Sequence, residues 1–465
     1  MSKKIIYILI IISHAIASNF SIYNQIDNTT AVSFNIGEYS IESINNFDRI
    51  ISSSKGRIEE YGSPELPLFS FNYGIEKNKE YSVTYDVLDY VVHQNINVYP
   101  SQPYSENSLS IIKNENLYQS SHRYPNENIE YDKLSIRGYE LLGISFIPFE
   151  YDFESKELKV YTQVSINITE IEQENNQDTT FPRSEIFENM YQNIIINDDI
   201  VYNDNRSFQK PSILYICGGN VATSDYNNFF KPLVEWKRQQ GFIVNVASLS
   251  QTGSSTTSIK NYISNAYYNW ENPPEFVCLV GDASGSIDVD TYTVGGGGGG
   301  WWGQSAQGEG DHPYTMLEGD DILSDIIIGR ISIRNTSELS TVVNKIIGYE
   351  KATYISQIGT DWYESAALVG DPYDSGISTV ITNEYINSIM DIHGGITDIR
   401  TKYSGNGFDS FMRDQINDGI SYLNYRGFYG FSNFTQSYVD ALNNGPKLPF
   451  LTTLTCDTGS FQSEN

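Results

Sequence analysis

The chain has 465 residues, of which 39% are hydrophobic and 13% aromatic, so it is expected to fold rather than to be disordered. This length accommodates roughly two to four domains. Its 29 Lys and Arg residues against 58 Asp and Glu residues give a net charge of -29, which excludes a nucleic-acid partner because phosphate binding needs a basic surface.

The N-terminus has the pattern of a secretory signal peptide. Lys3 and Lys4 precede an apolar run that ends at Ile12, and the small-residue pattern Ala15-Ile16-Ala17 follows. The apolar run is too short to cross a bilayer, and no later segment approaches the required ~20 apolar residues. We therefore expect a signal peptide over residues 1–17 and an exported protein, secreted or at the cell surface, with no transmembrane segment.

Residues 18–170 are predicted to form a β-rich domain. The clearest strand lies over residues 157–168, where apolar side chains alternate with polar ones. Residues 171–210 are crowded with Asn, Asp, Glu and Gln, which predicts a polar linker between two folded parts. In an exported protein this linker could contain a site of proteolytic maturation, although an ordinary linker is an equally good interpretation.

From residue 211 onward, strand patterns alternate with helix patterns, which predicts a mostly parallel sheet with helices on both faces. Two strands end in the same way, at Val280-Gly281-Asp282 and at Val369-Gly370-Asp371. This repetition suggests two similar α/β subdomains, over residues 211–352 and 353–465. We expect strands near 212–217, 242–247, 275–280, 324–333, 366–369, 396–401 and 420–425, and helices near 225–240, 258–270, 335–351, 378–393 and 408–416.

The last strand pattern leads to the strongest catalytic candidate. The β-prone run 448–455 ends at Cys456, and Asp457, Thr458 and Gly459 follow at once. In open α/β sheets, reactive groups lie at the carboxyl ends of strands. Cys456 is therefore placed where a nucleophile is expected, although a buried structural cysteine would also fit. Cys217 and Cys278 lie inside apolar strand patterns, where structural burial is expected, and the three widely spaced cysteines suggest neither a metal pair nor a disulfide framework.

Several segments, in their order along the chain, resemble the gingipain-type cysteine peptidases of peptidase family C25. The β-rich part resembles the propeptide of that family at residues 62–67 and at Arg137-Gly138-Tyr139. The segments that carry the peptidase resemblance are residues 232–242, 280–282, 311–314, 318–321, 328–332, 424–427 and 455–461.

The resemblance implies a caspase-like fold of two subdomains and a cysteine endopeptidase that hydrolyses peptide bonds through a thioester on Cys456. It implies an oxyanion hole formed by the backbone N–H groups of Cys456 and of the glycine turn at Gly427. Asp311 falls near a loop acid that shapes the specificity pocket of some members. The expected partners are a peptide or protein substrate and the chain's own propeptide, and no cofactor is required.

One departure from the family pattern concerns the general base. The family has a histidine in a Gly-His-Gly turn, whereas this sequence has Gly427-Phe428-Tyr429-Gly430, so Phe428 stands at the histidine position. Phenylalanine cannot accept the thiol proton or protonate the leaving amine. His312, on a long loop that follows a strand, is a candidate replacement base; Tyr429 suits this role less because a tyrosine pKa is about 10.

The same long loop contains six glycines, residues 295–300, followed by Trp301 and Trp302, which are candidates for contact with substrate. The glycine run is not a phosphate-binding loop, because the Gly-Lys-Ser/Thr ending is absent. Asp320, Asp321 and Asp325 could hold a structural calcium ion, although solvated turn acids explain them equally well.

Three functions therefore remain open from the sequence: an active endopeptidase precursor, a catalytically inactive family member that binds peptides or a surface partner, and a sortase-like processing of other exported proteins. Because the sequence ends at Asn465, before the helix expected after the Cys456 strand, we expect it to be a fragment of a longer product.

Overall fold

The computed structural model describes residues 19–54, 56–58, 60–77, 79–102, 111–119, 122–171, 181–197, 200, 206–295, 307–373, 376–390, 392, 395–456 and 458–459. Contacts divide the chain into two compact units. Unit 1 comprises Met1–Gln209 with Met316–Asp325, and unit 2 comprises Lys210–Thr315 with Ile326–Asn465. The segment 316–325 therefore belongs to unit 1 by its contacts, although it lies within the second half of the sequence.

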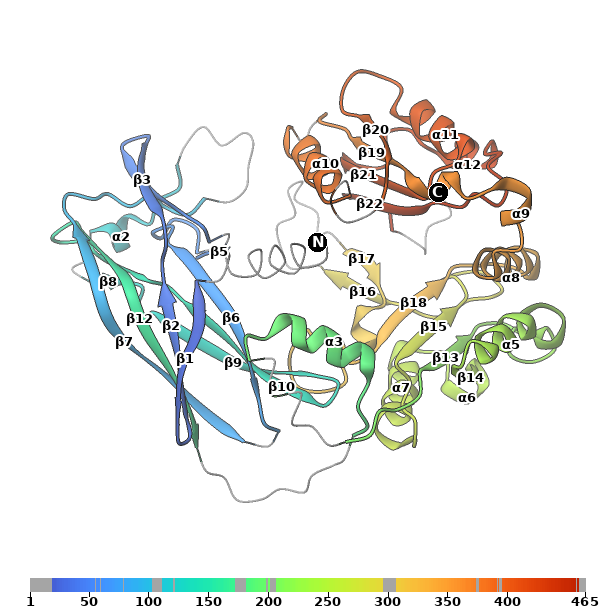
Figure 1. Ribbon diagram of the computed structural model, residues 1–465, viewed down its shortest axis with the longest axis horizontal. Coiled ribbons are helices and arrows are strands. Elements are labelled where there is room, and N and C mark those ends of the chain that lie inside the picture. Colours follow the sequence, from blue (N-terminus) through green and yellow to red (C-terminus); the bar gives the residue numbers. More distant parts are fainter. Residues whose placement is uncertain are drawn as a thin grey trace, which may run out of the picture. The chain divides into compact units, whose positions relative to one another are not determined.

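Unit 1 consists mainly of antiparallel strands (Figure 1). One sheet has the order β1-β2-β12-β11-β8, with β7 also paired to β12; a second has the order β5-β6-β10-β9, and β3 and β4 form a separate pair. The strands are β1 (Phe20–Ile26), β2 (Thr29–Asn35), β3 (Tyr39–Ile44), β4 (Phe47–Ser52), β5 (Gly56–Arg57), β6 (Pro67–Ile75), β7 (Glu80–His93), β8 (Arg123–Tyr124), β9 (Ile129–Ile136), β10 (Tyr139–Phe146), β11 (Phe149–Asp152) and β12 (Glu157–Ile171), with the short helix α2 (Glu115–Tyr118).

The core of unit 1 lies against the predicted strand near residue 160. Along β12 the alternate side chains Leu158, Val160, Val164, Ile166 and Ile168 are buried, as the period-two pattern predicts. Phenylalanine rings from other strands pack edge to face in the same core, with centroid separations of 5.2 Å for the pairs Phe34–Phe69 and Phe34–Phe146. The expectation of a β-rich N-terminal part is confirmed.

The segment predicted as a polar linker contains a packed helix, α3 (Glu185–Ile194). The Ser184 side chain accepts a hydrogen bond from the backbone N–H of Phe187 and caps the first turn. Phe187 and Tyr191, one turn apart, are buried, and the Tyr191 hydroxyl donates to the carbonyl of Glu140. The segment was predicted as a linker because most of its residues are polar, and the few apolar residues on one face of this helix do not change that composition.

Unit 2 contains two four-stranded parallel sheets, with the orders β14-β13-β15-β18 and β20-β19-β21-β22. Its strands are β13 (Ser212–Cys217), β14 (Ile243–Ser248), β15 (Phe276–Val280), β16 (Tyr292–Gly295), β17 (Gln307–Gly310), β18 (Ile327–Ile331), β19 (Ser365–Gly370), β20 (Asp398–Lys402), β21 (Tyr422–Tyr429) and β22 (Phe450–Cys456). Its helices are η1 (Tyr226–Phe230), α5 (Lys231–Gln239), α6 (Leu249–Thr252), α7 (Thr256–Asn269), η2 (His312–Tyr314), α8 (Thr336–Lys351), α9 (Ile355–Ile358), η3 (Asp361–Glu364), α10 (Ser378–Ile389), α11 (Phe408–Asp418) and α12 (Gln436–Asp440).

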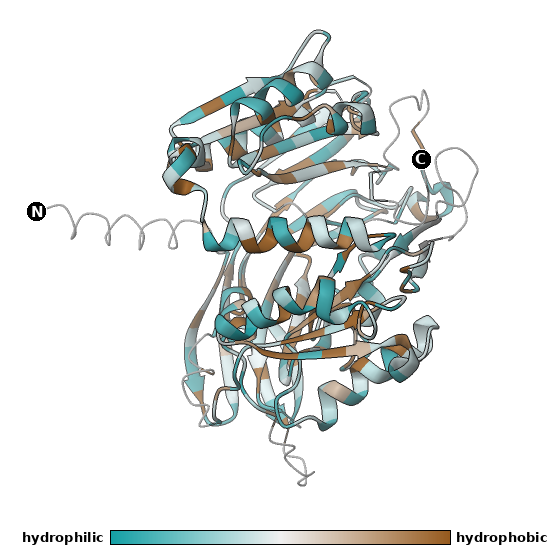
Figure 2. Cartoon of the chain, turned by 90° about the vertical axis from the view of Figure 1, so that its right-hand side faces the viewer, coloured by the Kyte–Doolittle hydropathy of each residue, from teal (hydrophilic) through white to brown (hydrophobic). Residues whose placement is uncertain are grey.

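Helices cover both faces of the second sheet. The buried side of α11 packs with Ala367 and Val369 of β19. On the opposite face, the Asn383 side chain of α10 donates to the Val369 carbonyl and accepts a hydrogen bond from Asn424 of β21. Both polar and apolar residues occur along the helices, as expected for elements with one face on a sheet (Figure 2). The predicted α/β class with mostly parallel sheets is confirmed.

Several element boundaries differ from the expected ranges, with the larger differences at β18, which covers Ile327–Ile331 instead of 324–333, at α10 and at β21. Helix α10 ends at Ile389 with Met390 as its C-cap, earlier than the predicted end at residue 393, which lies outside the described residues together with Gly394. Strand β21 continues to Tyr429 instead of ending at Tyr425, because its pairing with β22 extends past Gly427. The expected glycine turn over residues 427–430 is therefore largely strand.

The core of unit 1 provides a test of this packing. Leu158 on β12 is 0% exposed and Leu88 on the paired strand β7 is 62% exposed. We expect Leu158→Ala to lower the free energy of unfolding of unit 1 by about 2–5 kcal/mol, through lost burial and a residual cavity. The matched change Leu88→Ala should cost less than about 0.5 kcal/mol. Urea unfolding of the full chain measures both, and equal losses would contradict the burial of β12.

Candidate active site

Cys456 is the last residue of β22, at the carboxyl end of that strand. Its side chain is exposed, whereas Cys217 is buried and Cys278 is half-buried. Burial raises the pKa of the Cys217 thiol well above its usual value and raises that of Cys278 to about 12. A thiol with so high a pKa is a poor nucleophile near neutral pH, so Cys456 is the cysteine best placed to react with a substrate.

A β-bulge in β21 interrupts its regular pairing with β22 just before Cys456. Arg426 pairs with Leu454, and the next pair is Tyr429 with Cys456, so β21 advances three residues while β22 advances two. The pairing thus brings Tyr429, and not Phe428, opposite Cys456. The Gly430 N–H donates to the Cys456 carbonyl at 2.9 Å and holds the two chain ends together.

Gly427, one of the two predicted oxyanion-hole residues, lies inside this bulge and is buried. A side chain at this position would place its Cβ 2.3 Å from the Tyr425 hydroxyl, so any residue other than glycine would require the buried Tyr425 ring to move. Cys456, the other predicted oxyanion-hole residue, is the last residue of β22, the strand paired with β21. The assignment of their backbone N–H groups to an oxyanion hole stays a prediction.

A polar network that the sequence interpretation did not include lies at the same carboxyl edge. Asp371 follows β19 directly, and its carboxylate accepts hydrogen bonds from the Ser432 hydroxyl and from the Tyr373 N–H, the latter at 3.0 Å. The Tyr425 hydroxyl is 2.6 Å from the Ser432 hydroxyl. Ser432 has a φ of 43°, in the left-handed region that non-glycine residues seldom adopt. The Gly-Asp pattern at the end of β19 was the available signal for this acid.

Arg426 is a second residue that the sequence interpretation missed. Its guanidinium Nη1 donates to the carbonyl of Gly427 at 2.8 Å and to the carbonyl of Leu454 at 3.0 Å. Because Arg426 pairs with Leu454, and side chains alternate between the faces of a strand, Arg426, Leu454 and Cys456 project from the same face of the sheet. A fixed cationic group therefore lies on the same sheet face as the exposed thiol.

His312, the predicted replacement base, begins the short helix η2 and has an exposed side chain. Its carbonyl accepts hydrogen bonds from the Thr315 N–H and hydroxyl, at 2.8 and 2.7 Å. Within the described part of the chain, no hydrogen bond joins His312 to Cys456. Its role as a base stays a prediction.

Asp311, the predicted specificity acid, forms a two-pronged ion pair with Arg330. The guanidinium Nε and Nη2 atoms of Arg330 donate to the two carboxylate oxygens at 2.8 Å each, and the Thr291 hydroxyl donates at 2.9 Å. The side chain of Arg330 is 6% exposed and also donates to the carbonyls of Gly281, Asp282 and Val289. The pair therefore joins two loops at the carboxyl edge of the first sheet, and a contact between Asp311 and substrate stays a prediction.

Trp301, Trp302 and glycines 296–300 lie outside the described residues. The three predicted calcium ligands are described. Asp320 is exposed, whereas the Asp321 carboxylate accepts from the N–H groups of Ser135 and Leu323, and the Asp325 carboxylate accepts from those of Arg137, Leu317 and Glu318. Over the described residues, no three acidic, His or Cys side chains are arranged to hold a metal ion. The carboxylates of Asp321 and Asp325 thus act as acceptors for backbone N–H groups, and the calcium site stays a prediction.

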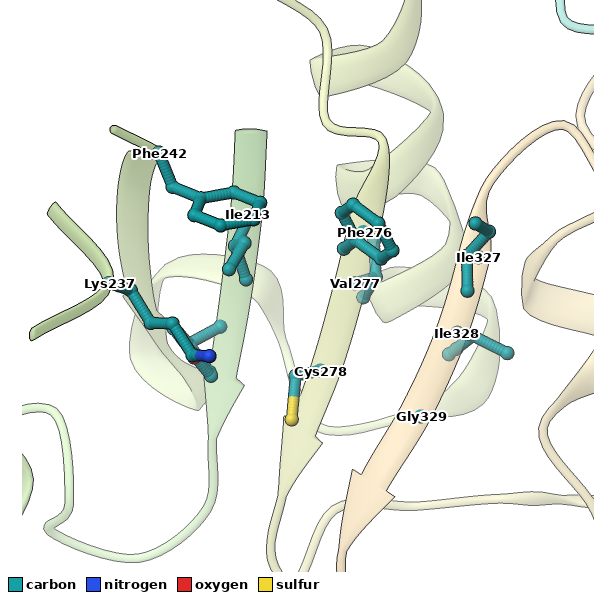
Figure 3. Close-up of a pocket in the computed structure, with 10 residues that line it drawn as sticks. Ile213, Lys237, Phe242, Phe276, Val277, Cys278, Ile327, Ile328 and Gly329 are labelled. Atoms are coloured by element: carbon teal, nitrogen blue, oxygen red, sulfur yellow. The ribbon is translucent and has the colours of Figure 1, made fainter. Parts of the chain in front are cut away.

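An apolar cavity of about 310 Å³ lies on the first sheet (Figure 3). Its walls come from the first residues of β13, β15 and β18, including Ile213, Phe276 and Ile327, together with Phe242 and Lys237. These residues lie toward the amino ends of their strands, whereas Cys456 terminates a strand of the other sheet. The cavity is therefore separate from the candidate active site.

Comparison with known proteins identifies the family. Residues 206–465 match the model of peptidase family C25, and residues 23–214 match the model of the C25 propeptide. The first match covers more than half of the chain. The chain therefore belongs to peptidase family C25 and includes a propeptide region of that family.

Curated relatives come from Porphyromonas gingivalis. The chain is 24% identical to gingipain R1 over 430 residues (87% of this chain and 40% of gingipain R1) and 23% identical to gingipain R2 over 423 residues (87% and 55%). It is 24% identical to Lys-gingipain over 350 residues (70% and 19%). The chain thus spans between 19% and 55% of the length of these relatives.

Two solved structures have a partial likeness to this chain. The crystal structure of the Arg-specific cysteine proteinase gingipain R has a TM-score of 0.45 and 23% identity, covering 55% of this chain and 57% of that chain. The complex of Porphyromonas gingivalis RgpB pro- and mature domains has a TM-score of 0.35 and 18% identity, covering 40% and 98%.

The buried carboxyl of Asp325 makes a testable prediction about pH. Burial raises its pKa from 3.8 to about 6, outweighing the three N–H donors that lower it. The folded state therefore holds this proton to a higher pH than the unfolded state does. As the pH rises from 3.8 to about 6, this group should lower the free energy of unfolding of unit 1 by roughly 3 kcal/mol. Above that range its contribution should stay constant.

Urea unfolding of unit 1 between pH 3.5 and 7.5 measures this dependence. Asp325→Asn should abolish the contribution, while the control Asp320→Asn should retain it, because Asp320 is exposed. Parallel pH profiles for the wild type and Asp325→Asn would show that Asp325 does not titrate in this range.

Proposed function

We propose that this chain is the precursor of an exported cysteine endopeptidase that hydrolyses peptide bonds through Cys456. The observation that carries the proposal is the exposed Cys456 thiol at the carboxyl end of a parallel strand, in a region that matches the C25 peptidase model. Strand ends of this kind present side chains to a crevice in open α/β sheets. Of the other two cysteines, Cys217 ends β13 but is buried, and Cys278 lies inside β15 and is half-buried; the thiols of both have raised pKa values.

In the proposed reaction the Cys456 thiolate attacks the peptide carbonyl carbon, and the C–N bond breaks to leave a thioester on sulfur. The leaving amine takes up one proton. Water then attacks the thioester carbonyl and releases a carboxylic acid, and the thiol is regenerated. Each step needs a group that accepts or donates a proton, and Phe428 supplies neither.

The same departure supports a second candidate, an inactive family member that binds peptides without cleaving them. Phe428 stands at the family's histidine position, and the residue opposite Cys456 is Tyr429. A phenol of pKa about 10 is a weak base at neutral pH. In this second case Cys456 would be exposed but no more reactive than a free thiol.

The proposal includes export of the protein and binding of the peptidase part by the chain's own propeptide. The signal-peptide pattern lies outside the described residues. Over the described part of the chain, no helix has the length and hydropathy needed to span a membrane. The match of residues 23–214 to the C25 propeptide supports the N-terminal part as the binding partner of the peptidase part.

Labelling with a thiol-directed peptidyl probe separates the two candidates. For an active enzyme, we expect one equivalent of label on the full chain, faster than the reaction of a free thiol at the same pH, and lost in Cys456→Ala. Cys278→Ala is the matched control and should label normally, because burial raises the pKa of that thiol. Labelling at the free-thiol rate, with no peptide cleavage, would favour the inactive binding protein. The same assay on His312→Ala tests the predicted replacement base.

The strand pairing predicts where a histidine would restore catalysis. Since Tyr429 is opposite Cys456, Tyr429→His should accelerate probe labelling by about a hundredfold, with a new inflection near pH 6.5. Phe428→His, one position earlier in the bulge, is the matched comparison and should accelerate labelling less. A larger effect from Phe428→His would show that the bulge closes in the working enzyme.

A further inference from the structure

The guanidinium of Arg426 is held in place by backbone carbonyls. Its Nη1 atom donates to the carbonyls of Gly427 and Leu454, one on its own strand and one on the neighbouring strand. Two bonds from one nitrogen fix the orientation of a planar group whose other nitrogens, Nε and Nη2, are also donors. Arg426 is half-buried, so part of its donor edge remains accessible.

In the described part of the chain, no carboxylate lies within ion-pair distance of Arg426. Other arginines in the same protein do have such partners, including Arg330 with Asp311 and Arg400 with Asp398. The absence of a carboxylate partner among the described residues stands out in a chain with a net charge of -29. Asp371, whose N–H donates to the Arg426 carbonyl, directs its carboxylate to Ser432 and Tyr373 instead.

Strand register places this cationic group on the same face of the sheet as the candidate nucleophile. Arg426 pairs with Leu454, and Cys456 is two residues further along β22, so their side chains share one face of the sheet. We propose that Arg426 binds a carboxylate group of the peptide that occupies the Cys456 site, and that this site therefore selects acidic peptides. The inference rests on the proposed location of the peptide site at Cys456.

Arg426 suits a carboxylate better than a neutral group, because guanidinium and carboxylate can form two parallel charge-assisted hydrogen bonds. The carboxylate can come from an Asp or Glu side chain next to the scissile bond or from the C-terminus of the peptide. Both sources present the same chemistry to Arg426, so the experiment includes one peptide of each kind.

The test uses the full chain carrying Cys456→Ala, so that binding is measured without any thiol chemistry. Three N-acetylated tripeptides are titrated by calorimetry: Ala-Ala-Asp amide, Ala-Ala-Asn amide and Ala-Ala-Ala with a free C-terminal carboxylate. We expect at least one carboxylate peptide to bind at least about tenfold more tightly than the Asn peptide, and the preference to weaken with added salt. The peptide that binds more tightly identifies the source of the carboxylate.

Substitutions at Arg426 assign the preference to this residue. In the Cys456→Ala background, Arg426→Gln should abolish the preference, and Arg426→Lys should keep part of it. Arg413→Gln should keep all of it, because Arg413 is a half-buried arginine already paired with Asp414. Thermal unfolding checks that each variant is folded. If Arg426→Gln does not fold, the shift of the Arg426 Nε–H resonance on adding the carboxylate peptides to the Cys456→Ala chain decides the question.

Equal binding of the Asp, Asn and C-terminal carboxylate peptides, a preference that survives Arg426→Gln, or no binding of any of them would overturn the inference. These outcomes are distinct from failure of the proposed function. A chain without peptidase activity can still bind carboxylate peptides at Arg426, and an active peptidase can ignore Arg426.

Discussion

The ladder of backbone hydrogen bonds between β21 and β22 determines what surrounds Cys456. Parallel pairing brings the carboxyl ends of the two strands together, and the bulge in β21 shifts the register by one residue immediately before the thiol. The position of Tyr429, the face shared by Arg426 and Cys456, and the burial of Gly427 all follow from this register. A change of one residue in either strand would present a different set of side chains to the thiol.

The sequence predicted those features that depend on local periodicity. Apolar residues that recur every two or about four residues predict strands and helices. Such patterns account for the alternation along β12, the order of strands and helices after residue 211, and the strand that ends at Cys456. The bulge and the position of Arg426 depend on pairing between segments that are not adjacent in sequence, so no local pattern reports them. Helix α3 was missed for another reason, because its two buried aromatic residues lie among many polar ones.

The candidate site was predictable to a similar degree. Cys456 could be selected from its place after an apolar run, and the family resemblance brought Phe428 to attention. Tyr429 gained its place opposite the thiol only through the strand register. Asp311 could be found by resemblance, but its full engagement by Arg330 could not, because the two residues meet only after two loops and a strand have folded together.

The segment 316–325 has a consequence for the integrity of the molecule. It is connected by sequence to the peptidase part, yet its acidic side chains accept hydrogen bonds from backbone N–H groups of β9 and of the turn between β9 and β10. A cut in the backbone near residues 209 and 210 would therefore yield two polypeptides that both contribute to one folded unit, as in fragment complementation. Hydrolysis of a single peptide bond and physical separation of the fragments are two different events in this protein, and the second requires the loss of those carboxylate contacts.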